Sequence, residues 1–299
     1  MKFGLSLVGL SPRYYPEIAA AAEVNGFESV WMPEHLVLPA TMPATYPYTE
    51  SGLPPIEPST PMFDPWVVLG AVANATSTIR LATNVYILPL RHPLVTARSV
   101  VTLDRVSGGR VTLGIGVGWC AEEFALAGQD FANRGRRTDE IIEILRTAWD
   151  RDHDVIEHHG EHYDLDPFCF QPKPVQKTGI PIEVGGASEA ALRRAGRIGD
   201  GWIEIAARER DVLVAKIATI NKHRAVAGRE HLPFEITCGI GRTASDVRWA
   251  AEMGVTRTTV GPEPHGSAIA DPTRPHARLS VQDFVDFTAR FADEVIAAT

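Results

Sequence analysis

Short apolar segments alternate along this chain with longer segments in which apolar residues recur every three or four positions. The short segments are typical of buried strands, and the longer ones are typical of amphipathic helices. Strands are predicted near Lys2–Val8, Ser29–Met32, Ile79–Ile87, Arg110–Gly114, Pro181–Val184, Trp202–Ile205, Glu235–Gly239 and Thr256–Val260. Helices are predicted near Pro16–Asn25, Pro65–Ala75, Leu94–Val106, Arg136–Asp150, Glu189–Ile198, Asp211–Ala227, Ala244–Glu252 and Val281–Ala297.

A regular alternation of strand and helix is typical of a parallel sheet whose connections are helices. Eight such repeats within 299 residues favour one closed (β/α)8 barrel, a TIM barrel, and an open doubly wound sheet stays the alternative. We therefore expect a single barrel domain over residues 1–299. Small turn-forming residues at Asn25-Gly26, Gly199 and Gly254 are expected to end three of the helices as C-caps.

Two longer segments interrupt the alternation. Residues Leu38–Pro61 contain seven of the 22 prolines and predict a long loop after the second strand. Residues Val155–Pro181 predict a hairpin followed by a loop that prolines break up. We expect both insertions to leave the carboxyl ends of strands, because long loops are usually functional and barrels place their active sites at that face.

Composition and charge narrow the class of protein. Apolar residues make up 44% and charged residues 22%, as in an ordinary globular protein. The net charge of −8 argues against nucleic acid as a partner, because no basic face offsets it. Cys120, Cys169 and Cys238 are widely spaced, odd in number and without a zinc or disulfide pattern. Neither a signal peptide nor an apolar run of membrane-spanning length is found, so we expect a cytoplasmic protein without membrane contact.

Candidate chemistry lies where predicted strands end. Glu34 and His35 follow the second strand, and an imidazole there can donate a hydrogen bond or transfer a proton near neutral pH. The alternative is a buried structural pair. Gly116-Val117-Gly118 follows the fourth strand, where glycines let the backbone approach a planar cofactor closely. Trp119 is expected either to form one wall of the cleft or to pack the following loop.

The segment Gly185-Gly186-Ala187-Ser188 leads from a strand into a helix. Free amides and the helix dipole make such a turn an anion site, and glycine permits close approach. Ser188 can cap the helix or bind the anion. A helix start without a ligand is the alternative.

Other polar residues carry weaker signals. Ser107-Gly108-Gly109-Arg110 is interpreted as a structural turn between a helix and a strand. Charged residues between Arg134 and Glu140 predict a solvated helix face with salt bridges. Arg208 is a candidate to meet an anionic substrate, with a surface charge as the alternative. The histidines His153, His158, His159 and His162 lack a convincing metal-ligand geometry, so no metal is predicted.

Three stretches together resemble the luciferase-like monooxygenase family, and more closely its branch that uses the deazaflavin coenzyme F420. They are Gly26–His35, then Ile79–Val85 continued through Pro89–Pro93 and Leu103–Arg110 into Leu113–Trp119, and finally Val184–Ser188 with Ala195–Trp202. The resemblance implies that His35 contacts the deazaflavin ring as a candidate proton donor or electrostatic stabiliser. It also implies a cis Asn84–Val85 peptide behind the ring and a cofactor phosphate bound at residues 185–188.

The resemblance implies an oxidoreductase that transfers a hydride between F420 and a small organic substrate. A flavin mononucleotide (FMN)-dependent monooxygenase of the same family stays an alternative. So do a non-catalytic cofactor-binding barrel and a metal-dependent hydrolase, although the first strand offers no metal ligands. The family is often dimeric, so a homodimer stays open. The substrate is not readable from the sequence.

Overall fold

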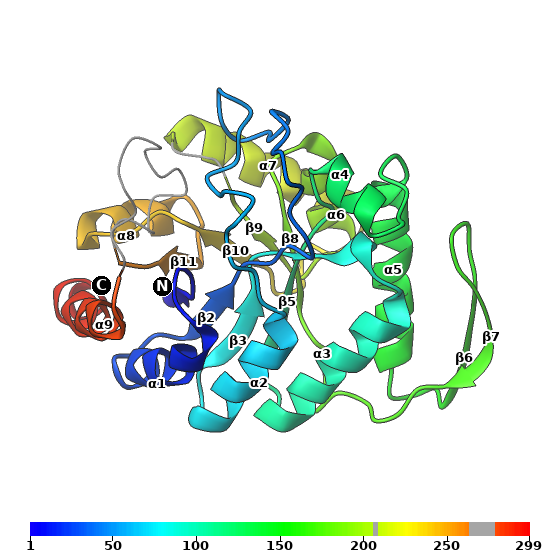
Figure 1. The fold of residues 1–299 in the computed structure, drawn as a ribbon, viewed down its shortest axis with the longest axis horizontal. Helices are drawn as coiled ribbons and strands as arrows, with labels where there is room; N and C mark the ends of the chain where they lie inside the picture. Colours follow the sequence, from blue (N-terminus) through cyan, green and yellow to red (C-terminus); the bar gives the residue numbers. More distant parts are fainter. Residues whose placement is uncertain (206–208, 263–278) are drawn as a thin grey trace.

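In the computed structural model, which describes residues 1–205, 209–262 and 279–299, eight parallel strands form a closed barrel surrounded by helices (Figure 1). In spatial order the barrel strands are β1 (Lys2–Ser6), β2 (Ser29–Met32), β3 (Arg80–Thr83), β5 (Val111–Gly116), β8 (Ile182–Gly185), β9 (Gly201–Ile203), β10 (Glu235–Cys238) and β11 (Arg257–Val260). Pairing of β1 with β11 and of β3 with β5 closes the ring. The closed barrel is confirmed over the open sheet.

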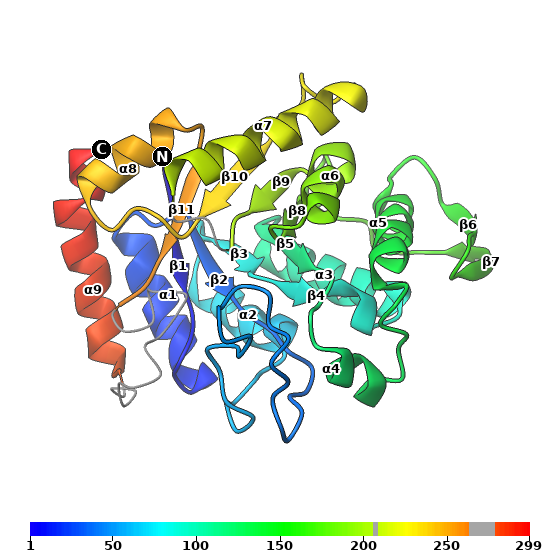
Figure 2. The same ribbon diagram turned by 90° about the horizontal axis from the view of Figure 1, so that it is seen from above.

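Each predicted helix is present and lies outside the barrel (Figures 1 and 2). The helices are α1 (Tyr15–Val24), α2 (Pro65–Ala75), α3 (Pro93–Ser107), α5 (Arg134–Trp149), α6 (Glu189–Ile198), α7 (Arg210–Val226), α8 (Ala244–Glu252) and α9 (Val281–Glu294). A short helix, α4 (Ala121–Leu126), was not predicted, because six residues are too few to show a helical period. Among the described residues, no helix is both long enough and apolar enough to cross a membrane.

Local sequence explains several helix boundaries. The Asp64 side chain accepts hydrogen bonds from the amides of Trp66 and Val67 at the start of α2. Gly26 and Gly254 adopt the left-handed conformation expected after a helix, with φ of 81° and 90°. Gly199 is the C-cap of α6, as predicted, but with φ −82° the chain leaves this helix in an extended conformation.

The predicted structural turn before β5 is confirmed. Gly108 ends α3 with φ 70°, and the buried guanidinium of Arg110 then reaches the end of α2. It donates to the carbonyl oxygens of Ala73 at 2.8 Å and Thr76 at 3.0 Å. These carbonyls have no partner inside their own helix, so Arg110 satisfies them and joins two neighbouring βα units.

Buried charges close the barrel interior at the amino ends of the strands. Arg257 Nη1 lies 2.8 Å from Glu183 Oε1, and Arg257 Nε lies 3.1 Å from Glu28 Oε2. The same guanidinium stands 5.1 Å from the centre of the Trp31 ring. Because these residues come from β8, β11 and β2, the contacts cross the barrel. These buried side chains fill the barrel interior at the amino ends of the strands. In barrels of this kind the active site lies at the opposite end, where the strands finish.

The two predicted insertions are present, but one was misplaced. Residues 33–64 form the expected long loop between β2 and α2. Strands β6 (Val155–His159) and β7 (Asp164–Cys169) form the expected hairpin. The hairpin follows α5 and precedes β8, so it does not leave the carboxyl end of a strand, and that expectation was wrong. Strand β4 (Tyr86–Ile87) also departs from the prediction of one continuous strand over residues 79–87.

Candidate active site

Four of the predicted site segments meet at the carboxyl end of the barrel. Residues 34–35 follow β2, residues 84–85 follow β3, residues 116–119 end and follow β5, and residues 185–188 end and follow β8. These four strands are consecutive neighbours in the barrel wall. Because parallel strands end at the same edge, the fold brings together segments that are separated by up to about 150 positions in sequence.

The His35 ring is held by a carboxylate from the unpredicted helix α4. Its Nδ1 lies 2.9 Å from Glu123 Oε2, and the other carboxylate oxygen accepts the Leu36 amide at 2.7 Å. The side chain of Glu123 is fully buried. A carboxylate in this position accepts the Nδ1 hydrogen and orients the ring, so Nε2 is left to act toward the cleft.

Glu34 has different partners from its neighbour. Its Oε2 accepts the Ile87 amide at 2.9 Å, and its Oε1 pairs with the Arg91 guanidinium. Burial raises the pKa of Glu34 above its ordinary value, and the adjacent Arg91 opposes that rise. These contacts tie the end of β2 to the chain beyond β3. They give Glu34 a positioning role, whereas His35 has a side chain in the cleft.

The Asn84–Val85 peptide is cis, as the family resemblance implied. Val85 packs over Trp31, Ala82 and Ile203 inside the barrel. Its methyl carbons lie 2.6 Å and 2.7 Å from where Cβ atoms on Gly116 and Gly185 would stand. These two glycines therefore make room for Val85, which forms the floor of the cleft. The sequence had predicted that the space beside Gly116 admits a cofactor.

Aromatic rings line one side of the cleft. The half-buried Trp119 meets His35 edge to face, with ring centres 6.0 Å apart, and meets Tyr46 in the same way at 5.1 Å. Tyr48 packs edge to face on Tyr46 at 5.3 Å. Val117, also half-buried, precedes Trp119 on the same segment. Trp119 thus packs between His35 and the loop after β2, and its expected role as a wall of a cleft stays a prediction.

The turn after β8 has the geometry of an anion site. Gly186 has φ 125°, a conformation that side-chain-bearing residues rarely adopt, and its carbonyl oxygen accepts Trp202 Nε1 at 2.8 Å. The Ser188 hydroxyl accepts the Ala191 amide at 3.2 Å, so Ser188 caps α6. The first-turn amides and the positive end of the helix dipole then lie beside a glycine backbone. This arrangement fits a phosphate group.

Comparisons with known proteins agree with this geometry. The model of the luciferase-like monooxygenase family matches residues 2–292. The chain belongs to that family. An uncharacterised protein of Mycobacterium tuberculosis is 35% identical over 263 residues, which cover 87% of this chain and 89% of that protein. This luciferase-like chain is therefore an enzyme, and the barrel and family inferred from its sequence are confirmed.

Two further proteins carry information on cofactors. An F420-dependent glucose-6-phosphate dehydrogenase of Amycolatopsis mediterranei is 29% identical over 225 residues, which cover 73% of this chain and 61% of that protein. The solved structure of a coenzyme F420-dependent tetrahydromethanopterin reductase from Methanopyrus kandleri superposes with a TM-score of 0.73. It is 17% identical and covers 99% of this chain and 98% of its own, so this likeness shows the fold alone.

Several important residues of the luciferase-like enzyme had no signal in its sequence. Glu123 lies 88 positions after its partner His35, on a helix too short to predict. Tyr46 and Tyr48 lie in a proline-rich loop that follows no period. Such side chains acquire their roles only when the fold places them beside the strand ends. Arg208, predicted as a substrate contact, lies outside the described residues.

The start of α5 differs from the solvated face that was predicted. Arg137 is buried and donates to the Pro89 carbonyl oxygen at 2.9 Å, and Arg134 donates to the Gly118 carbonyl oxygen at 3.1 Å. Only Arg136, paired with Glu161, remains well exposed at 72%. This end of α5 packs against the loops of the active-site face, so its arginines support those loops.

The four histidines at positions 153, 158, 159 and 162 pair with different carboxylates. His153 pairs with Asp150 at 2.8 Å, and His158 pairs with Glu140 at 3.1 Å. The described residues contain no group of three side chains placed to hold a metal ion.

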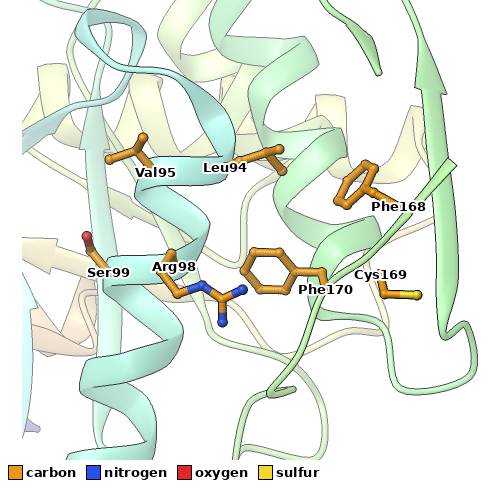
Figure 3. Close-up of a pocket in the computed structure, with 7 residues that line it drawn as sticks. All are labelled: Leu94, Val95, Arg98, Ser99, Phe168, Cys169 and Phe170. Carbon is orange, nitrogen blue, oxygen red and sulfur yellow. The ribbon is translucent and has the colours of Figure 1, made fainter. Parts of the chain in front are cut away.

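An open depression lies on the outer flank of the barrel between α3 and β7 (Figure 3). Its lining residues are Leu94, Val95, Arg98, Ser99, Phe168, Cys169 and Phe170. Arg98 lies over the Phe170 ring, 4.4 Å from its centre. This depression involves none of the strand-end segments, so it is separate from the active-site cleft.

Proposed function

We propose that this luciferase-like enzyme transfers a hydride between coenzyme F420 and a small organic substrate. The observation that carries the proposal is that the His35–Glu123 pair, after β2, and the Gly186 turn, after β8, lie at the same end of the barrel. Val85 forms the floor between them. The F420-dependent activity of the Amycolatopsis protein supports F420 over a flavin.

The residues present fit a deazaflavin whose side chain carries a phosphate ester. The turn of residues 185–188 would hold the phosphate, because it joins a glycine backbone to a helix start. Val85 and Trp119 would contact the two sides of the ring system, and both are half-buried apolar side chains. When bound, F420 supplies the two-electron hydride chemistry, while the protein supplies orientation and electrostatics.

His35 would stabilise charge and move a proton at its Nε2 atom. The Glu123 carboxylate, at 2.9 Å from Nδ1, keeps the ring in one orientation. Trp119 and Tyr46 cover this end of the cleft and reduce its contact with water. Glu34 keeps the preceding strand end in place through Arg91 and so supports this arrangement indirectly.

Cofactor titration tests the proposal. The full-length protein is titrated with F420 and, separately, with FMN, and the dissociation constants are measured from the change in cofactor fluorescence. We expect F420 to bind at least about tenfold more tightly than FMN, a difference of about 1.4 kcal/mol. The F420-loaded protein is then mixed anaerobically with a panel of alcohols and sugar phosphates, and deazaflavin absorbance is followed.

Each other outcome contradicts the proposal in a recognisable way. Tighter binding of FMN, together with substrate-dependent oxygen consumption, would favour the monooxygenase alternative. Tight binding of F420 without turnover across the panel would favour a cofactor-binding barrel. Failure to bind either cofactor would remove both activities.

A further inference from the structure

The loop between β2 and α2 reaches from the aromatic wall to the phosphate turn. In Figure 2 this loop and α4 project from the same side of the barrel. The Tyr48 hydroxyl oxygen lies 3.7 Å from the place where a Cβ on Gly186 would stand. The Ala187 backbone opposes the rise in the pKa of Tyr48, so it also lies near this hydroxyl. Tyr48 therefore touches the turn at the point where an anion would bind.

The Tyr48 ring is held in this place by other aromatic rings. It packs edge to face on Tyr46, and Tyr46 packs in the same way on Trp119. Such edge-to-face pairs stabilise the positions of the rings beyond the burial of their surface. The position of the hydroxyl is thus set by a series of contacts that begins at the His35 end of the cleft.

The Tyr48 hydroxyl has a hydrogen to donate toward an anion. A phenol hydroxyl carries one hydrogen that it can donate and lone pairs that can accept at the same time. Burial raises the pKa of Tyr48 above its ordinary value, and Glu204 raises it further, so the hydroxyl stays protonated at neutral pH.

The nearby carboxylates do not prevent an anion from binding here. The buried Glu204 carboxylate is neutralised by Lys216, whose Nζ lies 3.0 Å from Oε1. Glu189, in the first turn of α6, is 72% exposed and pairs with His223 on α7 at 3.3 Å. The positive end of the α6 dipole therefore still favours an anion at the turn.

We propose that Tyr48 is a phosphate-contacting residue whose hydroxyl donates a hydrogen bond to a phosphate-ester oxygen of the cofactor at the Gly186–Ala187 turn. The inference rests on the proposed function, because it takes the cofactor phosphate to bind at this turn. It adds a residue from the loop after β2 to a site otherwise built from the backbone and helix of the β8–α6 unit. Ligands that lack the phosphate gain nothing from the hydroxyl.

Four ligands and three proteins test this role. Dissociation constants are measured for F420 and FMN and for their phosphate-free counterparts, the deazaflavin riboside and riboflavin. The proteins are the wild type, Tyr48→Phe and the control Tyr163→Phe, which removes a hydroxyl on the distant hairpin. We expect Tyr48→Phe to weaken phosphate-bearing ligands about tenfold, the effect of one hydrogen bond to a charged group. Binding of the phosphate-free ligands should not change.

The outcomes separate this inference from the proposed function. Equal weakening of both ligand types by Tyr48→Phe would mean that the residue covers the ring, and would overturn the phosphate contact. Unchanged binding of F420 by Tyr48→Phe would overturn it too, while leaving the F420 activity in place. Selective weakening of FMN, with a wild type that does not bind F420 at all, would support Tyr48 and contradict the choice of F420. A wild type that binds no phosphate-bearing ligand would overturn both proposals.

Discussion

At the scale of single residues, the candidate chemistry depends on pairs that are distant in sequence. His35 owes its orientation to Glu123, 88 positions away, and the room for Val85 is provided by glycines on two other strands. The adjacent residues Glu34 and His35 have separate partners. A substitution of Glu34 should therefore have different effects from a substitution of His35.

Replacing His35 with alanine should lower kcat about 10²-fold, the usual effect of losing an acid–base or donor group. The dissociation constant of the cofactor should change much less, because the phosphate turn is untouched. Turnover and cofactor titration on the same folded variant provide the measurement. A kcat close to that of the wild type would show His35 to be structural.

Replacing Gly186 with valine should weaken cofactor binding by more than tenfold. A Cβ at this position meets the Ala191 Cβ at 3.0 Å, and φ of 125° is unfavourable for a β-branched residue. The matched control is Gly70→Ala in α2, where a Cβ meets nothing within 4 Å. Circular dichroism checks that both variants fold, and fluorescence titration measures their affinity. Unchanged affinity in a folded Gly186→Val protein would remove the anion site from this turn.

At the scale of secondary-structure elements, polar side chains join one βα unit to the next. Glu23 near the end of α1 accepts the amides of Ser77 at 2.9 Å and Ile79 at 2.8 Å, where the chain leaves α2 and enters β3. Arg110 makes the corresponding connection between the end of α2 and the start of β5. These contacts use backbone groups that helix ends leave unpaired.

Glu23 predicts a dependence of stability on pH. Burial alone would raise its pKa, but the hydrogen bonds from residues 77–79 lower the pKa from 4.5 to about 2. The carboxylate therefore stabilises the fold fully above its unfolded pKa, and this contribution is lost as the pH falls from about 4.5 through about 2. Glu23→Gln should lower the free energy of unfolding by about 1 kcal/mol at pH 7, since the group is partly solvated.

Urea unfolding at pH 7 and pH 3 measures the effect of Glu23→Gln. Glu17→Gln, an exposed change in the same helix, is the control and should alter stability little at either pH. The deficit of Glu23→Gln should shrink at the lower pH. A constant deficit at both values would contradict the assigned pKa.

At the scale of the whole molecule, the buried charges that stabilise the barrel and the candidate active site lie at opposite ends of the strands. The amino ends of the strands hold a buried ionic network around Arg257, and the carboxyl ends hold the cleft. The helices and loops that carry Glu123 and Tyr48 surround the cleft, and neither belongs to a barrel strand. The two ends can therefore be altered independently.

The ionic network predicts non-additive stability. Arg257→Met leaves Glu183 buried without its main partner and should cost about 3–5 kcal/mol in the free energy of unfolding. A double variant, Arg257→Met with Glu183→Leu, should be more stable than Arg257→Met alone, because no charge is then left unpaired in that pair. Chemical denaturation of the single and double variants measures the coupling. Additive losses would show that the two charges do not depend on each other.

The sequence by itself determined the features that arise from local periodicity and backbone freedom. The strand and helix repeats, the glycine turn of residues 185–188 and the position of His35 after a strand follow from spacings within a few residues. The closed barrel followed from eight such repeats. The family resemblance added the cis peptide at residues 84–85, which no local spacing implies.

Only the tertiary structure decided which side chains meet. It placed Glu123 beside His35 and Tyr48 beside the turn of residues 185–188, and it buried Arg137 where the helix pattern predicted a solvated face. It also put the hairpin of residues 155–169 after a helix, away from the carboxyl end of any strand. Contacts between residues many tens of positions apart depend on barrel closure and loop packing, and these leave no period in the chain.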